Sequence, residues 1–273
     1  MKLTYLGTAA AEGFPGIFCE CAVCRQAAAR GGKDLRTRSQ AIIDMQLLID
    51  LPPDTYWHMM RHALPLMELE HVLITHTHSD HFYPQELYYR RKGFCVTTKL
   101  MTLYGNDALV RKLDQYAAQT RSSLQEGLLA CQELKVFEAS QVGNYTVTAL
   151  PALHDRSENC LIFIIEKDGK RLLYGNDTGV FPDSVWQYLK GMPFDLISLD
   201  CTTGKERDGN NHMGVPDLID MKPRLMDNGN IQQDTRLVAT HFSHNGGMLH
   251  EDLKAALGPH GYLIAYDGMT IAI

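Results

Sequence analysis

Short apolar runs recur along the chain, and most of them are rich in β-branched and aromatic residues. Runs of about four to eight such residues, bounded by turn-forming residues, predict buried β-strands. The predicted strands are residues 3–6, 41–49, 72–75, 145–150, 161–166, 172–174, 196–199, 237–240 and 262–266.

Between these strands, the apolar positions recur with the period of an α-helix. The predicted helices are residues 84–91, 107–118, 182–189, 216–225 and 249–257. Three of them start near a proline, which suits the first turn of a helix. The alternation of strands and helices predicts a layered α/β fold. Because no repeat or linker-like segment interrupts the pattern, residues 1–273 are predicted to form one domain, with a helical excursion over 82–144.

The composition is that of an ordinary globular protein, with 45% hydrophobic and 21% charged residues. A formal net charge of −6 offers no broad basic surface, so nucleic acid is not an expected partner. No run of 18 apolar residues occurs, and the N-terminus has the pattern of a strand and a turn, so neither a membrane span nor a signal peptide is expected. These features favour a cytoplasmic protein.

The clearest chemical signal is the segment Thr75-His76-Thr77-His78-Ser79-Asp80-His81, which follows the apolar run 72–74. Residues two apart in an extended chain point the same way, so His76 and His78 can bind one ion. Asp80 and His81 can then turn toward a neighbouring position. Imidazole and carboxylate ligands suit zinc, manganese or iron. A solvated polar loop is the alternative, but four ligand-type residues in six positions make a metal site the better interpretation.

Three later residues share this local context. His154, Asp177 and His241 each follow a predicted strand by a few residues. Ligand sites in α/β folds gather beyond the carboxyl ends of strands, so the common placement marks these residues as candidates for the same site.

At these positions the sequence resembles the metallo-β-lactamase-fold hydrolases. The resemblance implies a four-layer αβ/βα sandwich. It also implies one metal on His76, His78 and His154, and a second on Asp80, His81 and His241, with Asp177 as the bridge. In this family a hydroxide between the two metals is the nucleophile, and Asp80 counts as a catalytic residue as well as a ligand.

A second candidate metal site lies near the N-terminus. Cys19, Cys21 and Cys24 supply three thiolates within six residues, and His244 is available as the fourth ligand of a structural zinc. The chain has seven cysteines, an odd number, which favours a reducing compartment and a metal site over disulfides. Three buried cysteines without a metal are the alternative.

The combination of both sites resembles a narrower group, the phosphoribosyl cyclic phosphodiesterases of the phosphonate-degrading carbon–phosphorus lyase pathway. This resemblance implies a small cyclic ribose phosphodiester as substrate and a further histidine, here His212, as general acid. Two segments, 82–144 and 221–235, are long for that group, so the substrate is left open at this point.

Other activities of the same superfamily remain alternatives. Gly13-Phe14-Pro15 before the cysteines is similar to a protein of pyrroloquinoline quinone biosynthesis. A lactonase, a tRNA 3′-processing nuclease and a non-catalytic metal-binding module are further options, although the complete ligand set favours a hydrolase. The expected partner is a small-molecule phosphodiester, with no membrane partner and with a homodimer as one option.

Overall fold

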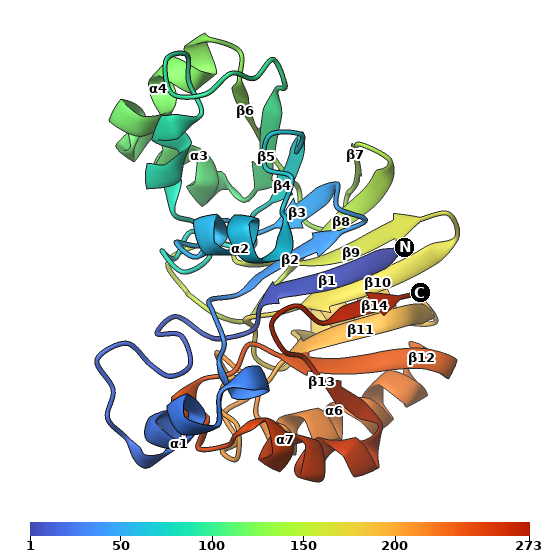
Figure 1. The fold of residues 1–273 in the computed structure, drawn as a ribbon. Coiled ribbons are helices and arrows are strands. Elements are labelled where there is room, and N and C mark those ends of the chain that lie inside the picture. The colour runs from blue at the N-terminus through green and yellow to red at the C-terminus, as the bar shows by residue number, and fades with distance from the viewer.

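The computed structural model describes residues 1–273, with the side chain of Gln119 left out. Its centre is a pair of seven-stranded sheets (Figure 1). The first sheet has the order β14 (Thr270–Ala272), β1 (Lys2–Gly7), β2 (Gln40–Ile43), β3 (Leu47–Ile49), β4 (His71–Leu73), β5 (Met101–Gly105) and β6 (Leu129–Glu133). The second has the order β13 (Tyr262–Ile264), β12 (Ile231–Thr240), β11 (Phe194–Asp200), β10 (Lys170–Gly175), β9 (Leu161–Lys167), β8 (Tyr145–Pro151) and β7 (Ala139–Val142).

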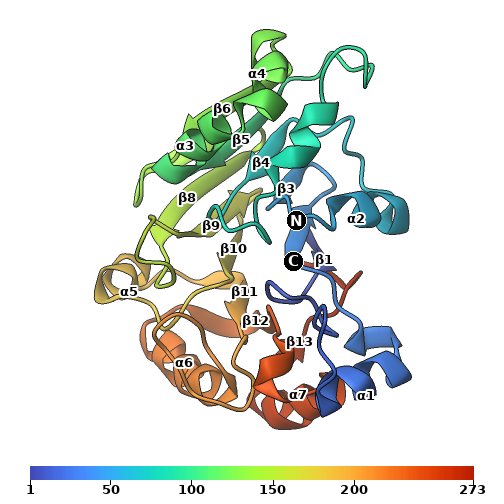
Figure 2. The same cartoon turned by 90° about the vertical axis from the view of Figure 1, so that its left-hand side faces the viewer.

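Helices cover the outer face of each sheet, as the two views of the ribbon show (Figures 1 and 2). The helices are α1 (Ala22–Arg30), α2 (Thr55–His62), α3 (Asp107–Gln115), α4 (Ala117–Gln125), α5 (Asp183–Leu189), α6 (Val215–Asp227) and α7 (His250–Leu257). Leu109 and Leu113 of α3 pack against the first sheet, whereas Leu218 of α6 and Leu253 of α7 pack against the second.

A third cluster of buried residues lies between the sheets and joins, for example, Ile43 of β2 with Val147 of β8 and Tyr174 of β10. Three apolar clusters, one between the sheets and one under each helix layer, make this an αβ/βα sandwich. The predicted four-layer fold is therefore confirmed.

The predicted strand 41–49 is a hairpin rather than one strand. Asp44 and Met45 both have positive φ angles, 51° and 57°, so the chain reverses between β2 and β3. Left-handed positions in hairpin turns usually hold glycine. Its absence from these positions explains why the pattern alone predicts a continuous strand.

The expectation of a helical excursion over 82–144 is only partly right and needs correction. The stretch contains α3 and α4, but β5 and β6 extend the first sheet, and β7 forms an edge of the second. Residues 84–89, predicted as α-helix, form a 3-10 helix. Short runs such as Met101–Gly105 become strands because β4 already offers an edge with which they can pair. The pattern does not predict helix α1. The spacing of His58 and His62 predicts an exposed helix face; the helix is present as α2, but His58 is buried.

The candidate site residues follow strands that point the same way. β4 is parallel to β3 and β5, and in the second sheet β10, β11 and β12 run parallel to one another. The loops after β4, β8, β10, β11 and β12 therefore meet at one end of the sandwich. No helix in the part of the chain that the structure describes is long and apolar enough to cross a membrane.

Candidate metal centre and active site

Three residues of the site leave their strands in a left-handed conformation. Asp50, Asp177 and His241 have φ angles of 67°, 51° and 61°, and each lies at most two residues beyond a strand. Non-glycine residues rarely adopt this region, and such strain gathers at functional sites. The sharp turns direct all three side chains back into the space between the strand ends.

The first group of candidate ligands consists of His76, His78 and His154, whose ligand atoms lie within 4.8 Å of one another. His76 Nε2 is 3.0 Å from His78 Nδ1, and His154 Nε2 is 3.3 Å from the same atom. Two of these histidines follow β4, and the third follows β8. The structure thus brings together the three residues expected to hold one metal.

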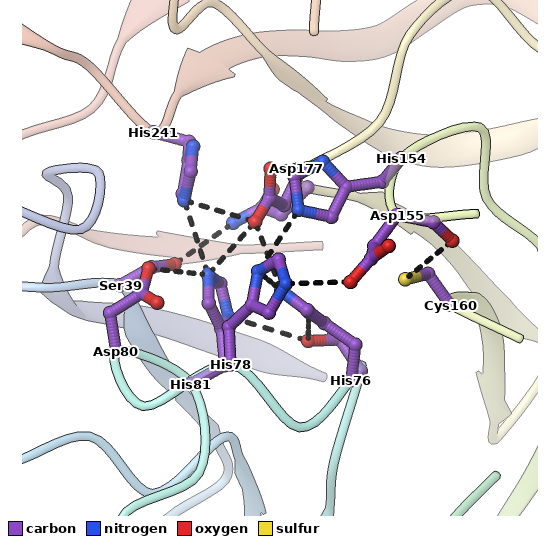
Figure 3. A network of polar contacts seen from close by, with 12 residues as sticks. Ser39, His76, His78, Asp80, His81, His154, Asp155, Cys160, Asp177 and His241 are labelled. Carbon is purple, nitrogen blue, oxygen red and sulfur yellow. Dashed lines mark hydrogen bonds and ion pairs between the residues drawn. The ribbon is translucent and has the colours of Figure 1, made fainter. Parts of the chain in front are cut away.

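The second group consists of Asp80, His81, Asp177 and His241. Their ligand atoms also lie within 4.8 Å of one another, and all four residues are buried. His81 Nε2 lies 3.2 Å from His241 Nε2 and 3.1 Å from Asp177 Oδ2. Asp177 Oδ2 is also 3.4 Å from His76 Nε2 in the first group. Asp177 therefore stands between the two groups, where a bridging ligand is expected (Figure 3).

The chemistry of this donor set fits two divalent cations. Asp177 Oδ1 is buried without a hydrogen bond among the described residues, although His212 Nδ1 and His154 Nδ1 lie 3.0 and 3.3 Å away. Burial raises the pKa of Asp177, but the imidazoles, with His241 first, hold this pKa well below its usual value. An ionised, unsatisfied carboxylate oxygen among converging imidazole nitrogens is an arrangement that a metal ion satisfies.

His81 shows how the surroundings favour positive charge at this point. Burial lowers the pKa of His81, but Asp80 and Asp50 outweigh it and raise the pKa well above the ordinary value for histidine. The same carboxylates stabilise any cation bound at Nε2, whether it is a proton or a metal ion.

Further residues orient the candidate ligands through their second ring nitrogen, as is usual around metal-binding histidines. Asp50 Oδ2 is 2.7 Å from His81 Nδ1, and Asp155 Oδ2 is 2.9 Å from His78 Nε2. Thr202 Oγ1 is 2.7 Å from His241 Nδ1, and Asp200 Oδ2 is 3.3 Å from the same nitrogen.

Sequence reasoning missed these orienting residues. Asp50 and Asp200 carry a usable signal, since each closes an apolar strand at the site end of its sheet. Asp155 directly follows His154, but nothing in its local pattern indicates that it contacts His78, which is 77 positions away.

His212, the expected general acid, lies beside Asp177. Its Nδ1 is 3.0 Å from Asp177 Oδ1 and 3.5 Å from Asp200 Oδ2. Asp200 also accepts a hydrogen bond from the backbone N–H of Met213 at 2.8 Å, which fixes the loop that carries His212. Burial lowers the pKa of His212, but the two carboxylates outweigh it and raise the pKa to about 11. Its ring nitrogen also lies close enough to Asp177, Asp200 and His241 to act as a metal ligand.

The cysteine cluster also assembles as expected. Ligand atoms of Cys19, Cys21, Cys24 and His244 lie within 4.8 Å of one another, and His244 Nδ1 is 3.7 Å from the sulfur of both Cys19 and Cys21. Three thiols and one imidazole around a common centre fit a closed tetrahedral zinc site. Gly16 permits this approach, because a Cβ at that position would lie 2.6 Å from the His244 ring.

The cysteines differ in acidity. Cys21 caps the N-terminus of α1, and the backbone N–H of Cys24, together with other hydrogen bonds, lowers the pKa of Cys21 to about 6. Burial raises the pKa of Cys24 to about 12. A metal ion that replaces the proton would offset that burial cost, since thiolates are the form that binds metal.

Comparisons with known proteins agree with this geometry. A sequence model of the family described as the β-lactamase superfamily domain matches residues 46–242, which is well over half of the chain. This range includes the His76–His81 motif and His241 but not the cysteine cluster. No curated protein matches the sequence.

Several solved structures share the whole fold at low sequence identity. A diphosphatase from the PhnP family is 21% identical with a TM-score of 0.74, over 100% of this chain and 97% of that one. Zn²⁺-bound PqqB from Methylobacterium extorquens is 22% identical with a TM-score of 0.77, over 100% of both chains. The short form of human tRNase Z is 18% identical with a TM-score of 0.65, over 100% of this chain and 99% of that one. With the family match over residues 46–242, these similarities establish that the chain belongs to the β-lactamase superfamily of metal-dependent hydrolases and has the metallo-β-lactamase fold.

Proposed function

We propose that the protein is a dinuclear-metal-dependent phosphodiesterase that hydrolyses a small cyclic ribose phosphodiester. The observation that carries the proposal is the position of His212, 3.0 Å from the carboxylate that joins the two ligand groups. A proton donor at this place suits a reaction whose leaving group is a poor one, such as a ribose alkoxide. Thioester hydrolysis gives no comparable reason for a proton donor beside the ligands, because a thiolate leaves with little protonation.

In this proposal, His76, His78 and His154 would hold one divalent cation, and Asp80, His81 and His241 a second, with Asp177 between them. Zinc and manganese are the expected metals, with iron as a further option. When bound, such a pair supplies an activated water and neutralises charge that develops on phosphorus. Cys19, Cys21, Cys24 and His244 would hold a separate structural zinc.

The task of His212 is to hold a proton for the departing ribose oxygen. Its Nδ1 contacts Asp177 and Asp200, so Nε2 is the nitrogen left to face the substrate. The raised pKa, about 11, keeps the ring protonated at neutral pH. Cations beside Asp177 would lower this pKa toward the range in which an acid releases its proton readily.

Two of the structurally similar proteins, a diphosphatase and a tRNase Z, support chemistry at phosphorus. The net charge of −6 favours a small substrate over RNA. We further propose a cytoplasmic location, because three thiols within six residues keep their metal-binding form in a reducing compartment.

We expect His212→Ala to slow hydrolysis most for the substrates with the poorest leaving groups. For a cyclic ribose phosphate the loss in kcat should be on the order of 10² to 10³, within the range of general acid catalysis. For bis(4-nitrophenyl) phosphate the loss should stay below about tenfold, because nitrophenolate needs little protonation to leave. Initial rates on both substrates, with the metal content of each preparation, measure the difference.

His260→Ala, in the short 3-10 helix after α7, is the matched control and should keep both rates. If His212→Ala lowers the rate equally for the substrate with the good leaving group and the one with the poor leaving group, His212 is not the general acid. A loss of metal that parallels the loss of rate would make His212 a ligand instead.

A further inference from the structure

Two hollows meet at His78 and His154, and only one of them contains the candidate acid. The first, of about 530 Å³, is also lined by His212 and Asp177. The second, of about 660 Å³, is lined by Arg156 and Asn210 but not by His212. A leaving oxygen that takes its proton from His212 must therefore depart into the first hollow. This step rests on the proposed function.

The wall of the first hollow beyond the candidate ligands carries acceptors and small polar groups. They are Glu12, Thr203, Glu206, Ser243 and Asn245. No lysine or arginine lines this hollow among the residues that the structure describes. Arg156, the cation next to the site, lines the other hollow. Away from His212 and the candidate metal ligands, a second phosphate on the sugar would thus face two carboxylates and no lysine or arginine, which costs free energy.

Glu12 is the best-oriented of these groups. Its Oε1 accepts a hydrogen bond from Ser243 Oγ and lies 3.4 Å from His244 Nε2 and 3.5 Å from Asn245 Nδ2. Its Cγ packs against Gly16, where an added Cβ would lie 3.3 Å away. Oε2 makes no hydrogen bond with any described residue. Because His244 also belongs to the cysteine cluster, that cluster fixes one oxygen of a side chain that lines the hollow and leaves the other oxygen available.

We propose that Glu12 is a specificity residue, and that its Oε2 accepts a hydrogen bond from a hydroxyl of a ribose that bears no phosphate besides the cyclic one. The same carboxylate, with Glu206 in the lining of the same hollow, disfavours a sugar that bears a second phosphate. The cysteine cluster then has a second effect besides stability, since it holds a substrate-binding side chain in place. Preorganised acceptors of this kind give selectivity because they lose little entropy when they bind.

The test compares ribose 1,2-cyclic phosphate bearing a free 5-hydroxyl with the same compound bearing a 5-phosphate. The metal-loaded wild type should prefer the free hydroxyl by at least about tenfold in kcat/KM, the effect of one hydrogen bond to a charged group. Glu12→Gln should reduce that preference about tenfold, mainly through KM for the free hydroxyl substrate. Glu70→Gln, at the opposite end of β4, should keep the wild-type preference.

Zinc content and melting temperature of Glu12→Gln separate recognition from damage to the cysteine cluster. Retained zinc with a changed preference supports the assignment. An unchanged preference in Glu12→Gln, a wild type that favours the 5-phosphate, or a change that appears only with zinc loss would overturn it. If one of these outcomes is found while bis(4-nitrophenyl) phosphate is still cleaved, only the assignment to Glu12 is wrong. If no phosphodiester is cleaved at all, the proposed function is wrong as well.

Discussion

Asp177→Ala is expected to lower kcat by about 10³-fold or more while the protein remains folded. Asp177 contacts both groups of candidate ligands, so its removal weakens two cation sites at once. The charge stabilisation supplied by a metal pair is worth several kcal/mol in the transition state, and each 1.36 kcal/mol is a factor of ten in rate. The protein should stay folded because Asp177 belongs to none of the three apolar clusters that hold the layers together. Steady-state kinetics and thermal unfolding of metal-loaded protein measure the two effects.

Asp183→Ala is the control, since Asp183 lies fully exposed at the start of α5. It should leave both the rate and the melting temperature unchanged. Turnover by Asp177→Ala within tenfold of the wild type would contradict the bridging role.

We expect Cys21→Ser to have the opposite effects, a large loss of thermal stability and a small loss of catalytic rate. Structural zinc contributes about 10–16 kcal/mol to the folding of small domains, so one of four ligands represents about 3 kcal/mol. For a chain of this size that corresponds to a fall in melting temperature of about 10 °C. The kcat per folded, metal-loaded molecule should stay within a few-fold of the wild type, because Cys21 contacts no candidate ligand of the dinuclear site.

Cys95→Ser is a matched control, since Cys95 is a partly exposed thiol outside the cluster. Zinc content, thermal unfolding and initial rates should be measured on both variants. Equal melting temperatures for Cys21→Ser and Asp177→Ala, together with equal losses of activity, would contradict the separation of structural and catalytic roles.

The candidate ligands could be predicted because each one has a local signal. His76, His78 and Asp80 lie within a single motif after a strand, and His154 and His241 follow strands that are apolar enough to recognise. Parallel strands then place these loops at one end of the sheets. The positions agree with the expected ligand groups, while the identity of the bound metals remains a prediction.

The orienting contacts could not be predicted, because they join residues that are distant in sequence. Asp50 meets His81 across 31 positions, and Thr202 meets His241 across 39. Their residue types are common in turns, so the local sequence does not distinguish an orienting Asp or Thr from a solvated one. The contacts of Glu12 could not be predicted for the same reason, because its partners Ser243 and His244 lie near the other end of the chain.

The errors in the fold have a related cause. β5 and β6 are short strands with few strongly apolar residues, and they form because β4 provides a neighbouring edge. The period of the apolar residues reports the face that an element buries, but it does not report pairing with a distant partner. The hairpin between β2 and β3 was missed because its left-handed turn is made by Asp44 and Met45.

The most direct test of the central claim is an activity panel on protein stripped of metal and then reloaded with zinc or manganese. Initial rates should be measured on a cyclic ribose phosphate, bis(4-nitrophenyl) phosphate, a homoserine lactone and a thioester. The account predicts hydrolysis of both phosphodiesters that is lost on chelation and restored by metal, with much lower rates on the lactone and the thioester. Metal-dependent cleavage of the lactone or the thioester without cleavage of either phosphodiester would contradict it.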